Sequence, residues 1–364
     1  MINGKTIAVV VPCYNEETQI GVVIDTMPEF VDRIVVVNDC SKDRTAEIVR
    51  GYIAKDRVKA AVIPWLPTEI TPTFFNRADI VVQEMRKAEE PKYPPHAVEN
   101  DNDNDRIVLI NNIKNARVGG AILNGYKWCR DHGIDCTAVM AGDAQMDPSE
   151  LYGICAPVVQ EGIDYVKGNR LRHKASRLMV PKKRYFGNSV LSAMTKVASG
   201  YWTVSDTQTG YTAISLSALN AIDLFDIYRT YGVPNDILIK LNIARCTLRE
   251  IPIKPVYAVG EQSKMKIGKV IPTVSWLLIK GFFKRIFKKY LINDFHPIFL
   301  FYLLGMLSSL VGLYFLIYVL YGLFANVAIS TGTYLGFVSM FVASLVFIGF
   351  AMWFDVYDNE GLQR

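Results

Sequence analysis

The C-terminal part of the sequence lacks charged side chains. No Asp, Glu, Lys or Arg occurs from Ile298 to Phe354, and soluble cores seldom sustain such a length without one. Two apolar stretches, 298–323 and 333–354, are each long enough as helices to cross a hydrocarbon core of about 30 Å. We therefore predict that residues 297–364 form a transmembrane helical hairpin, which turns at the polar residues 326–333, and a short tail.

Acidic residues are missing from the segment before it. From Gln262 to Asn293 the sequence has eight Lys or Arg residues and no Asp or Glu. Basic residues that flank a span favour the cytoplasmic side, so the N-terminal domain and the tail are both predicted there. Within residues 261–296, Lys280, Lys284 and Lys288 form one helical stripe, and apolar side chains form another, namely Trp276, Ile279, Phe283, Ile286, Phe287 and Tyr290. This pattern predicts a helix in the lipid interface; a helix packed on the domain is the alternative.

Cysteine pairs and cysteine–histidine clusters are absent as well. The six cysteines include no CxxC pair, and none of the four histidines lies at metal-ligand spacing from a cysteine, which excludes the common zinc motifs and predicts free thiols in a reducing compartment. The net charge of +5 is small and indicates no nucleic-acid partner. No secretory leader is expected, because the apolar run after Lys5 is short and ends at Pro12.

Residues 1–260 alternate short β-branched runs with amphipathic stretches. The predicted strands are 7–11, 34–37, 107–110, 138–141 and 165–167, and the predicted helices include 18–27, 44–54, 119–131 and 148–161. This alternation predicts an α/β domain with a mixed, mainly parallel sheet flanked by helices. Ligands of such sheets bind beyond the carboxyl ends of the strands.

An insertion at about 58–106 interrupts this alternation. It is far longer than an ordinary helix–strand loop, and it contains six prolines and the polar run 99–105. Residues 78–87 are predicted to be helical. The insertion is either a surface decoration or a loop that contacts substrate or a partner.

Two clusters of polar residues follow the first two predicted strands. The first is Pro12-Cys13-Tyr14-Asn15-Glu16, which offers an aromatic face and polar groups for the base or ribose of a nucleotide. Asn15 also suits a helix cap. In the second cluster, Asp39 can accept hydrogen bonds from a base or sugar edge, whereas Ser41 or Asp43 suits a helix cap.

A third cluster, Gly142-Asp143-Ala144-Gln145-Met146-Asp147-Pro148, follows the fourth predicted strand. Asp143 and the Gln145 carbonyl supply two hard oxygen ligands for Mg²⁺ or Mn²⁺, and such a cation neutralises a departing pyrophosphate. The more cautious interpretation of Asp147-Pro148 is a helix start, with Asp147 as the N-cap. Further polar positions are spread along the chain: Arg170, Arg184, Asn188, Asp206, Asn235, Asp236, Ser263 and Lys264.

Taken in order, these motifs resemble family 2 glycosyltransferases, above all the dolichyl- or polyprenyl-phosphate sugar transferases that carry a C-terminal membrane hairpin. The motifs are Pro12-x-Tyr14-Asn15-Glu16, Asn38-Asp39-x-Ser41-x-Asp43, Gly142-Asp143-x-Gln145-x-Asp147-Pro148, Asp206-x-Gln208-x-Gly210 and Ser263-Lys264. The resemblance covers nearly everything outside the insertion. It implies a GT-A fold, a divalent metal, a nucleotide-sugar donor and inversion of configuration.

The resemblance also implies roles for single residues. Pro12, Tyr14, Glu16 and Asp39 would contact the nucleotide, and Asp143 and Gln145 the metal. Arg170 and Arg184, with Asn188, would hold the acceptor phosphate, and Ser263 and Lys264 would close over the phosphates. The motif departs from the family at Ala141, where an Asp is usual, and one carboxylate of the metal motif is therefore missing.

Three functions remain open on the sequence. The first is sugar transfer to a lipid phosphate, an anion that needs no strong general base; UDP is favoured over GDP as the carrier only because it is commoner. The second is transfer to a hydroxyl of another membrane-associated glycan or lipid, for which Asp206 and Asp236 are the candidate bases. A processive synthase is disfavoured because no Gln-x-x-Arg-Trp motif occurs. The third is a silent membrane scaffold, suggested by Ala141.

Overall fold

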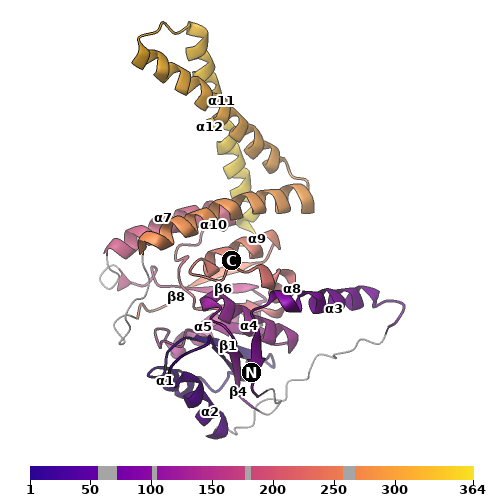
Figure 1. Ribbon diagram of the computed structural model, residues 1–364. Coiled ribbons are helices and arrows are strands. Elements are labelled where there is room, and N and C mark those ends of the chain that lie inside the picture. The colour runs from indigo at the N-terminus through magenta and orange to yellow at the C-terminus, as the bar shows by residue number, and fades with distance from the viewer. Residues whose placement is uncertain (56–71, 101–104, 177–181, 257–266) are drawn as a thin grey trace.

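The structure is a computed structural model. It describes residues 1–55, 72–100, 105–176, 182–256 and 267–364, and within these ranges the side chains of 182–188 and 267–270 are left out of the description. Figure 1 shows an α/β domain, a layer of long helices on it, and a helical hairpin that projects from that layer.

The domain is built on an 8-stranded sheet in the order β3-β4-β2-β1-β5-β7-β6-β8. Four strands at its centre are parallel: β1 (Ile7–Cys13), β2 (Arg33–Asn38), β4 (Ile107–Asn112) and β5 (Cys136–Val139). β7 (Thr212–Ser215) runs antiparallel between β5 and β6 (Tyr165–Asn169), and β8 (Leu248–Pro252) pairs parallel with β6. The predicted mixed, mainly parallel sheet is confirmed, with all five predicted strands in it; β3, β7 and β8 were not predicted.

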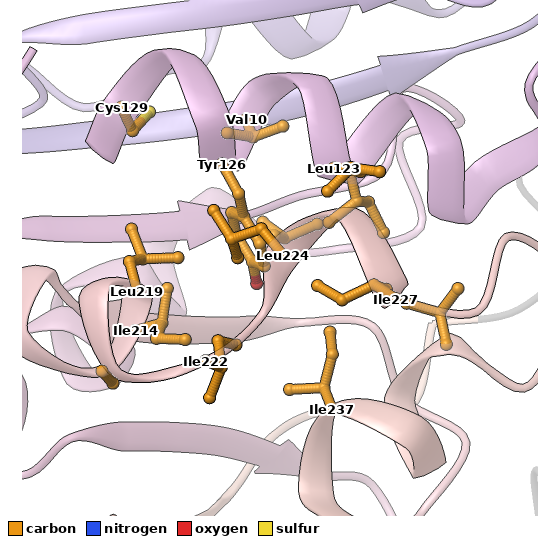
Figure 2. Packing of buried hydrophobic residues seen from close by; sticks show 14 of the residues in the cluster. Val10, Leu123, Tyr126, Cys129, Ile214, Leu219, Ile222, Leu224, Ile227 and Ile237 are labelled. Atoms are coloured by element: carbon orange, nitrogen blue, oxygen red, sulfur yellow. The ribbon is translucent and has the colours of Figure 1, made fainter. Parts of the chain in front are cut away.

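Alternate residues of each strand point to opposite faces, so one strand serves two cores. Val9 and Val11 of β1 face a core covered by α1 (Ile20–Asp25), α2 (Thr45–Lys55) and α5 (Leu151–Glu161). Val10 faces the other core, with α4 (Arg117–Asp131), α8 (Leu216–Ala221) and α9 (Val233–Ile243). Figure 2 shows this second core, where Tyr126 lies among aliphatic side chains from several elements.

Helix α4 lies unusually close to the sheet. A Cβ at Gly125 would come within 2.3 Å of a Val10 methyl group. Glycine at this position therefore lets the helix backbone approach β1, and a larger side chain would push α4 away from the sheet.

Part of the insertion is integrated into the domain. β3 (His96–Val98) pairs antiparallel with β4 at the edge of the sheet. The predicted helix is confirmed as α3 (Arg77–Glu89), which has no buried residue and projects from the body in Figure 1. The 3-10 turn η1 (Glu90–Lys92) joins it to β3. Residues 56–71 and 101–104 of the insertion lie outside the described residues.

Long helices form a layer between the sheet and the hairpin. α7 (Lys182–Ser199) and α10 (Ile267–Phe287) lie side by side, with α9 beneath them (Figure 1). Trp276, Ile279, Phe283 and Phe287 of α10 are each between 44% and 59% exposed. The predicted apolar stripe is therefore present on an open face. Two of its predicted members differ: Ile286 and Tyr290 are buried against the protein.

The lysine stripe of this region also differs from the expectation. Lys284 Nζ lies 2.5 Å from Asp226 Oδ2, and Lys288 Nζ lies 3.8 Å from Asp223 Oδ2. Both aspartates belong to the domain, around the short turn η3 (Leu224–Asp226). Two of the three lysines therefore pair with the protein. These pairs were not predicted because their acidic partners are distant along the chain.

The predicted hairpin is formed by α11 (Pro297–Ala325) and α12 (Thr331–Glu360), both long and apolar enough to cross a membrane. The hydroxyl groups of Ser309 and Ser344 lie 2.5 Å apart across the pair. A Cβ at Gly305 would come within 2.6 Å of Ile348, so small residues allow the helices to pack closely. Most large side chains on the hairpin are exposed, as expected for lipid-facing helices.

The C-terminus returns to the α/β domain. The N–H of Leu248 donates to the carbonyl of Leu362 at 2.7 Å, and the N–H of Arg364 donates to the carbonyl of Leu248 at 3.0 Å. Both ends of the hairpin therefore lie on the side of the domain. The predicted short tail continues α12 to Glu360 and then adds a bridge beside β8.

Candidate active site

The carboxyl ends of six strands meet at one edge of the sheet. β7 pairs antiparallel with both β5 and β6, so β6 and β8 run in the same direction as β1, β2, β4 and β5. Loops that carry the predicted site residues leave from this edge after Cys13, Asn38, Val139 and Asn169. An edge of this kind is where α/β sheets bind their ligands.

The loops after β1 and β2 are tied together. Ser41 Oγ accepts a hydrogen bond from the Asn15 N–H at 3.0 Å, and Asn15 Oδ1 accepts one from the Lys42 N–H at 2.8 Å. Asn15 and Cys40 have φ of 56° and 60°, in the left-handed region that Asn tolerates better than most residues. The structure thus brings Pro12, Tyr14, Asn15, Glu16 and Asp39 together, and it gives Asn15 a part in shaping the loops.

Asp39 is held by a chain of amides. Its Oδ1 accepts hydrogen bonds from Asn112 Nδ2 and from the Ala116 N–H, both at 2.7 Å. Asn112 is fixed in turn by Asn124, whose Nδ2 donates to Asn112 Oδ1 at 2.7 Å. Among the residues that the structure describes, none donates to Asp39 Oδ2. The carboxylate is therefore oriented through one oxygen, which leaves the other for a ligand edge.

Asp143 lies in a tight turn after β5. Its Oδ1 accepts a hydrogen bond from the Gln145 N–H at 3.1 Å, and Ala144 between them has a φ of 58°. Gly142 packs against the end of β1 so closely that a Cβ there would lie 2.6 Å from Cys13 Sγ. Burial raises the pKa of Asp143. A carboxylate destabilised by burial gains from a bound cation, which restores its ionised form.

Carboxylates from three loops gather around the end of β1. The pKa of the buried Cys13 thiol is raised well above its usual value, first by burial and then by the charges of Glu16, Asp143 and Asp43. Within the described ranges, no three His, Cys, Asp or Glu residues form a ready-made metal site. Asp143 with the Gln145 carbonyl fits the sparser protein shell of Mg²⁺, which takes its other ligands from phosphates and water.

Asp147 has a different task from Asp143. Its Oδ1 accepts a hydrogen bond from the Ser149 N–H at 2.9 Å, and Pro148 opens the 3-10 turn η2 (Pro148–Glu150). Its Oδ2 lies 2.9 Å from Lys254 Nζ. The interpretation of Asp147-Pro148 as a helix start is confirmed.

Arg170 and Asp206 form a two-point ion pair beyond the end of β6. Arg170 Nε donates to Asp206 Oδ2 at 2.9 Å and Nη2 donates to Oδ1 at 3.1 Å. The Asp206 side chain is 0% exposed and that of Arg170 is 27% exposed. Burial would raise the pKa of Asp206, but the Arg170 guanidinium and the Lys167 ammonium outweigh it and lower that pKa.

Two residues that sequence reasoning missed support this pair. Glu250 of β8 accepts hydrogen bonds from Asn169 Nδ2 at 2.6 Å and from the Ser205 N–H at 3.0 Å, and a longer one from the Asp206 N–H. Lys167 of β6 is 0% exposed and its Nζ donates to the Thr209 carbonyl. Burial lowers the pKa of Lys167 to about 8, against the opposing charges of Asp206 and Glu250. A lysine in a predicted buried strand was the available signal for this cluster.

Asp236 lies in the first turn of α9. Its Oδ2 accepts hydrogen bonds from the Tyr228 N–H at 2.8 Å and from Lys240 Nζ at 2.9 Å. The neighbouring Asn235 is fully buried, and its Oδ1 accepts a hydrogen bond from Thr195 Oγ1 at 3.1 Å. Both side chains thus connect α9 to the surrounding elements.

The remaining predicted site residues are not described. Arg184 and Asn188 belong to the first turns of α7, and their side chains are left out of the description. Ser263 and Lys264 lie outside the described residues.

Together, the mixed, mainly parallel sheet and the polar loops at its carboxyl edge form an α/β fold with a candidate ligand site where such sheets bind their ligands. The family model of glycosyl transferase family 2 matches residues 8–64, which contain β1, β2 and their loops. This part of the chain is similar to family 2, and the chain is a glycosyltransferase.

The chain is also similar to the following relatives and solved structure. The chain is 26% identical over 254 residues to the UDP-N-acetylglucosamine–dolichyl-phosphate N-acetylglucosaminyltransferase of Methanococcus voltae, an alignment that covers 70% of this chain and 86% of that one. It is 25% identical over 288 residues to an uncharacterized protein of Methanocaldococcus jannaschii, covering 79% and 95%. Glucosyl-3-phosphoglycerate synthase from Mycobacterium tuberculosis, solved with Mn²⁺ and UDP, aligns with 78% of this chain and 80% of its own at 16% identity and a TM-score of 0.47.

Proposed function

We propose that this enzyme transfers a sugar from a nucleotide-sugar to a polyprenyl or dolichyl phosphate at the cytoplasmic face of a membrane, with inversion at the anomeric carbon. One observation carries the proposal: Arg170, held by Asp206, lies at the same sheet edge as Asp143, in a chain with two apolar helices fit to span a membrane. Arg170 can thus bind the acceptor phosphate at the same edge where Asp143 can bind the divalent cation of the donor diphosphate.

The donor half of the site is formed by the loops after β1, β2 and β5. Tyr14 is 36% exposed and offers a ring for stacking. Asp39 is oriented by Asn112 and Ala116 and accepts hydrogen bonds from the base or sugar. We favour UDP as the carrier because the Methanococcus voltae relative is named for a UDP-sugar.

A divalent cation, Mg²⁺ or Mn²⁺, fits Asp143 and the Gln145 carbonyl. When bound, such an ion neutralises the charge of the departing nucleotide diphosphate. The turn 142–145 fixes the Asp143 carboxylate through its hydrogen bond with the Gln145 N–H. The Ala141 side chain contributes no ligand. Asp143 is therefore the one carboxylate that residues 141–145 offer to the cation.

The acceptor half needs positive charge more than a base. A phosphate monoester is largely ionised near neutral pH, since its second pKa is about 6, and its oxygen can attack without losing a proton to the protein. Arg170 supplies a guanidinium whose plane is set by Asp206. Asp206 and Asp236 are each occupied by a cationic side chain, which weakens both as general bases for a hydroxyl acceptor.

A transfer assay tests the proposal. The purified protein is incubated with Mg²⁺ or Mn²⁺, a labelled UDP- or GDP-sugar and a polyprenyl phosphate, and the lipid is then extracted. We expect label in the lipid phase that depends on the cation and on Asp143. Label that appears only with a glycan or lipid hydroxyl acceptor would support the second function, and no turnover with any donor by a folded protein would support a scaffold.

A further inference from the structure

A buried ion pair joins the catalytic domain to the membrane hairpin. Arg285 of α10 and Asp355 of α12 are both 0% exposed. Arg285 Nη1 donates to Asp355 Oδ1 at 2.7 Å and Nη2 donates to Oδ2 at 2.8 Å. Tyr290 Oη donates a further hydrogen bond to Asp355 Oδ1 at 2.6 Å. The carboxylate of a predicted transmembrane helix is therefore saturated by groups of the helix layer.

The same guanidinium also holds the end of α7. Arg285 Nε donates to the carbonyl of Ala198 at 2.9 Å and Nη2 donates to the carbonyl of Val197 at 3.0 Å. These carbonyls belong to the last turn of α7, where a cation is favoured. Gly200 makes room, because a Cβ there would lie 2.7 Å from Arg285 Nη1. One side chain thus ties α12 to the helix whose first turns contain Arg184 and Asn188.

A second set of contacts runs beside the first. Lys289 Nζ donates to Asn359 Oδ1 at 2.6 Å and pairs with Asp358 Oδ2 at 3.0 Å. Asn242 of α9 donates to Asn359 Oδ1 at 2.7 Å. We call residues Asn242, Arg285, Lys289, Tyr290, Asp355, Asp358 and Asn359 the anchor cluster. It connects α9, α10 and the π-helical turn η4 (Lys288–Asn293) to the last two turns of α12.

Buried charges of this kind are a poor means of gaining stability. Removing two ions from water is costly, and a well-packed apolar contact is often as stable. A saturated ion pair adds a fixed orientation, because apolar surfaces can slide at little cost, whereas these hydrogen bonds form only at one relative position of the helices. The anchor cluster therefore fixes the angle and height at which the domain sits on the hairpin.

We propose that Arg285 and Asp355 are positioning residues that align the active site with an acceptor embedded in the bilayer. This inference rests on the proposed function and narrows its substrate class. The phosphate of a membrane lipid lies at one height relative to the bilayer. An active site held at the same height is therefore already positioned to bind it. A soluble phosphate with the same headgroup reaches the site from any direction and does not need the anchor cluster.

The test compares two acceptors in variants reconstituted in lipid nanodiscs. One acceptor is a long-chain polyprenyl phosphate in the disc, and the other is a short-chain, water-soluble prenyl phosphate. For Asp355→Asn we expect kcat/KM to fall on the order of 10- to 100-fold with the embedded acceptor and to change less than about threefold with the soluble one. Arg285→Lys keeps the charge but loses the two-point contact of the guanidinium with Asp355. Its kcat/KM with the embedded acceptor should lie between those of Asp355→Asn and the wild type. Asp226→Asn, which breaks the pairs of Asp226 with Lys284 and Lys240 outside the anchor cluster, is the matched control.

A second measurement does not depend on turnover. Cys40 is the exposed one of the six cysteines, and the other five are buried, so a dye can be attached at the site edge and its energy transfer to dyes in the bilayer recorded. We expect Asp355→Asn to change or broaden this transfer and Asp226→Asn to leave it as in the wild type.

The outcomes are separable. Equal losses with both acceptors, or unchanged energy transfer in Asp355→Asn, would overturn the positioning role and leave a purely structural one. A wild type that shows no activity with either phosphate would refute the proposed function, and the energy-transfer result would still decide whether the anchor cluster sets the height of the domain.

Discussion

Arg170 and Asp206 meet through three hydrogen bonds at the edge of the sheet. Besides the two from the guanidinium, the Arg170 backbone N–H donates to Asp206 Oδ2 at 3.0 Å. Asp206 therefore fixes both the main chain and the side chain of Arg170. Because the Arg170 side chain is 27% exposed while its partner is buried, the pair orients a cation toward the edge rather than hiding it.

This relationship predicts the effect of Arg170→Lys. A lysine keeps the charge but contacts Asp206 and a phosphate at single points. We expect the KM for the lipid phosphate to rise about tenfold or more, whereas nucleotide binding measured by calorimetry stays within about twofold. Arg172→Lys, an exchange at an exposed position two residues on, is the control. An equal loss of nucleotide binding in Arg170→Lys would contradict an acceptor-side role.

Glu250 offers a test of how the pair is supported. Glu250→Ala leaves the N–H groups of Ser205 and Asp206 without their acceptor, at a cost of about 1–3 kcal/mol for a buried group. Glu250→Gln keeps one acceptor oxygen and should cost less. We expect the melting temperature to fall, and the KM for the acceptor to rise, in the order wild type, Glu250→Gln, Glu250→Ala. Glu161→Ala, which breaks an exposed pair with Arg249, should change neither, and a Gln variant as impaired as Ala would argue against hydrogen bonding as the cause.

Much of the fold was predictable because burial leaves a plain pattern. Strands such as 7–11 and 107–110 are β-branched on both faces, as parallel strands covered by helices require. The strands that escaped prediction have weaker patterns. β7 is four residues long, β3 is three, and β8 contains Arg249 and Glu250, so their positions follow from pairing with distant strands rather than from local composition.

The site was predictable where it follows a strong strand and not where it depends on distant partners. Asp39 and Asp143 stand directly beyond buried strands, so their motifs could be seen in the sequence. Asp236 pairs with Lys240 one helix turn away. The four-residue spacing in the sequence does not show whether Asp236 is an ion-pair partner or a general base. Arg285 and Asp355 are seventy positions apart, and only the docking of α12 onto α10 brings them together.

The exchange of Asp for Asn is predicted to lower activity far more at Asp143 than at Asp147. Asp143→Asn removes the carboxylate that burial destabilises, and we expect activity to fall about 100-fold or more, with a weaker response to Mn²⁺ in titrations. Asp147→Asn keeps an N-cap for η2, since Asn caps as well as Asp, and should lower activity only a few-fold. Comparable losses in both variants would show that the Asp143 carboxylate has no special role.

Lys167 predicts a pH dependence of stability. Its pKa is about 8 in the folded protein and 10.5 as the usual value, so the unfolded chain binds the extra proton between these pH values. The stabilising contribution is therefore present above about pH 10.5 and is lost as the pH falls through about 8, a change of about 3 kcal/mol. We expect the melting temperature of the wild type, relative to Lys167→Met, to rise from pH 7.5 to 10. A difference that stays flat with pH would mean that Lys167 has an ordinary pKa.

The exposed stripe of α10 predicts that Trp276 lies in the membrane interface. Its side chain is 59% exposed and lies on α10, the helix that precedes the hairpin. Brominated lipids quench the fluorescence of a tryptophan at the membrane surface. The signal of Trp276 is the difference between the wild type and Trp276→Phe in nanodiscs. We expect brominated lipid to quench this difference signal. The corresponding difference for Trp128, which is 8% exposed in the domain core, should be unaffected. If the Trp276 signal also persists in brominated lipid, α10 faces water or another protein, and the domain is held to the membrane by the hairpin alone.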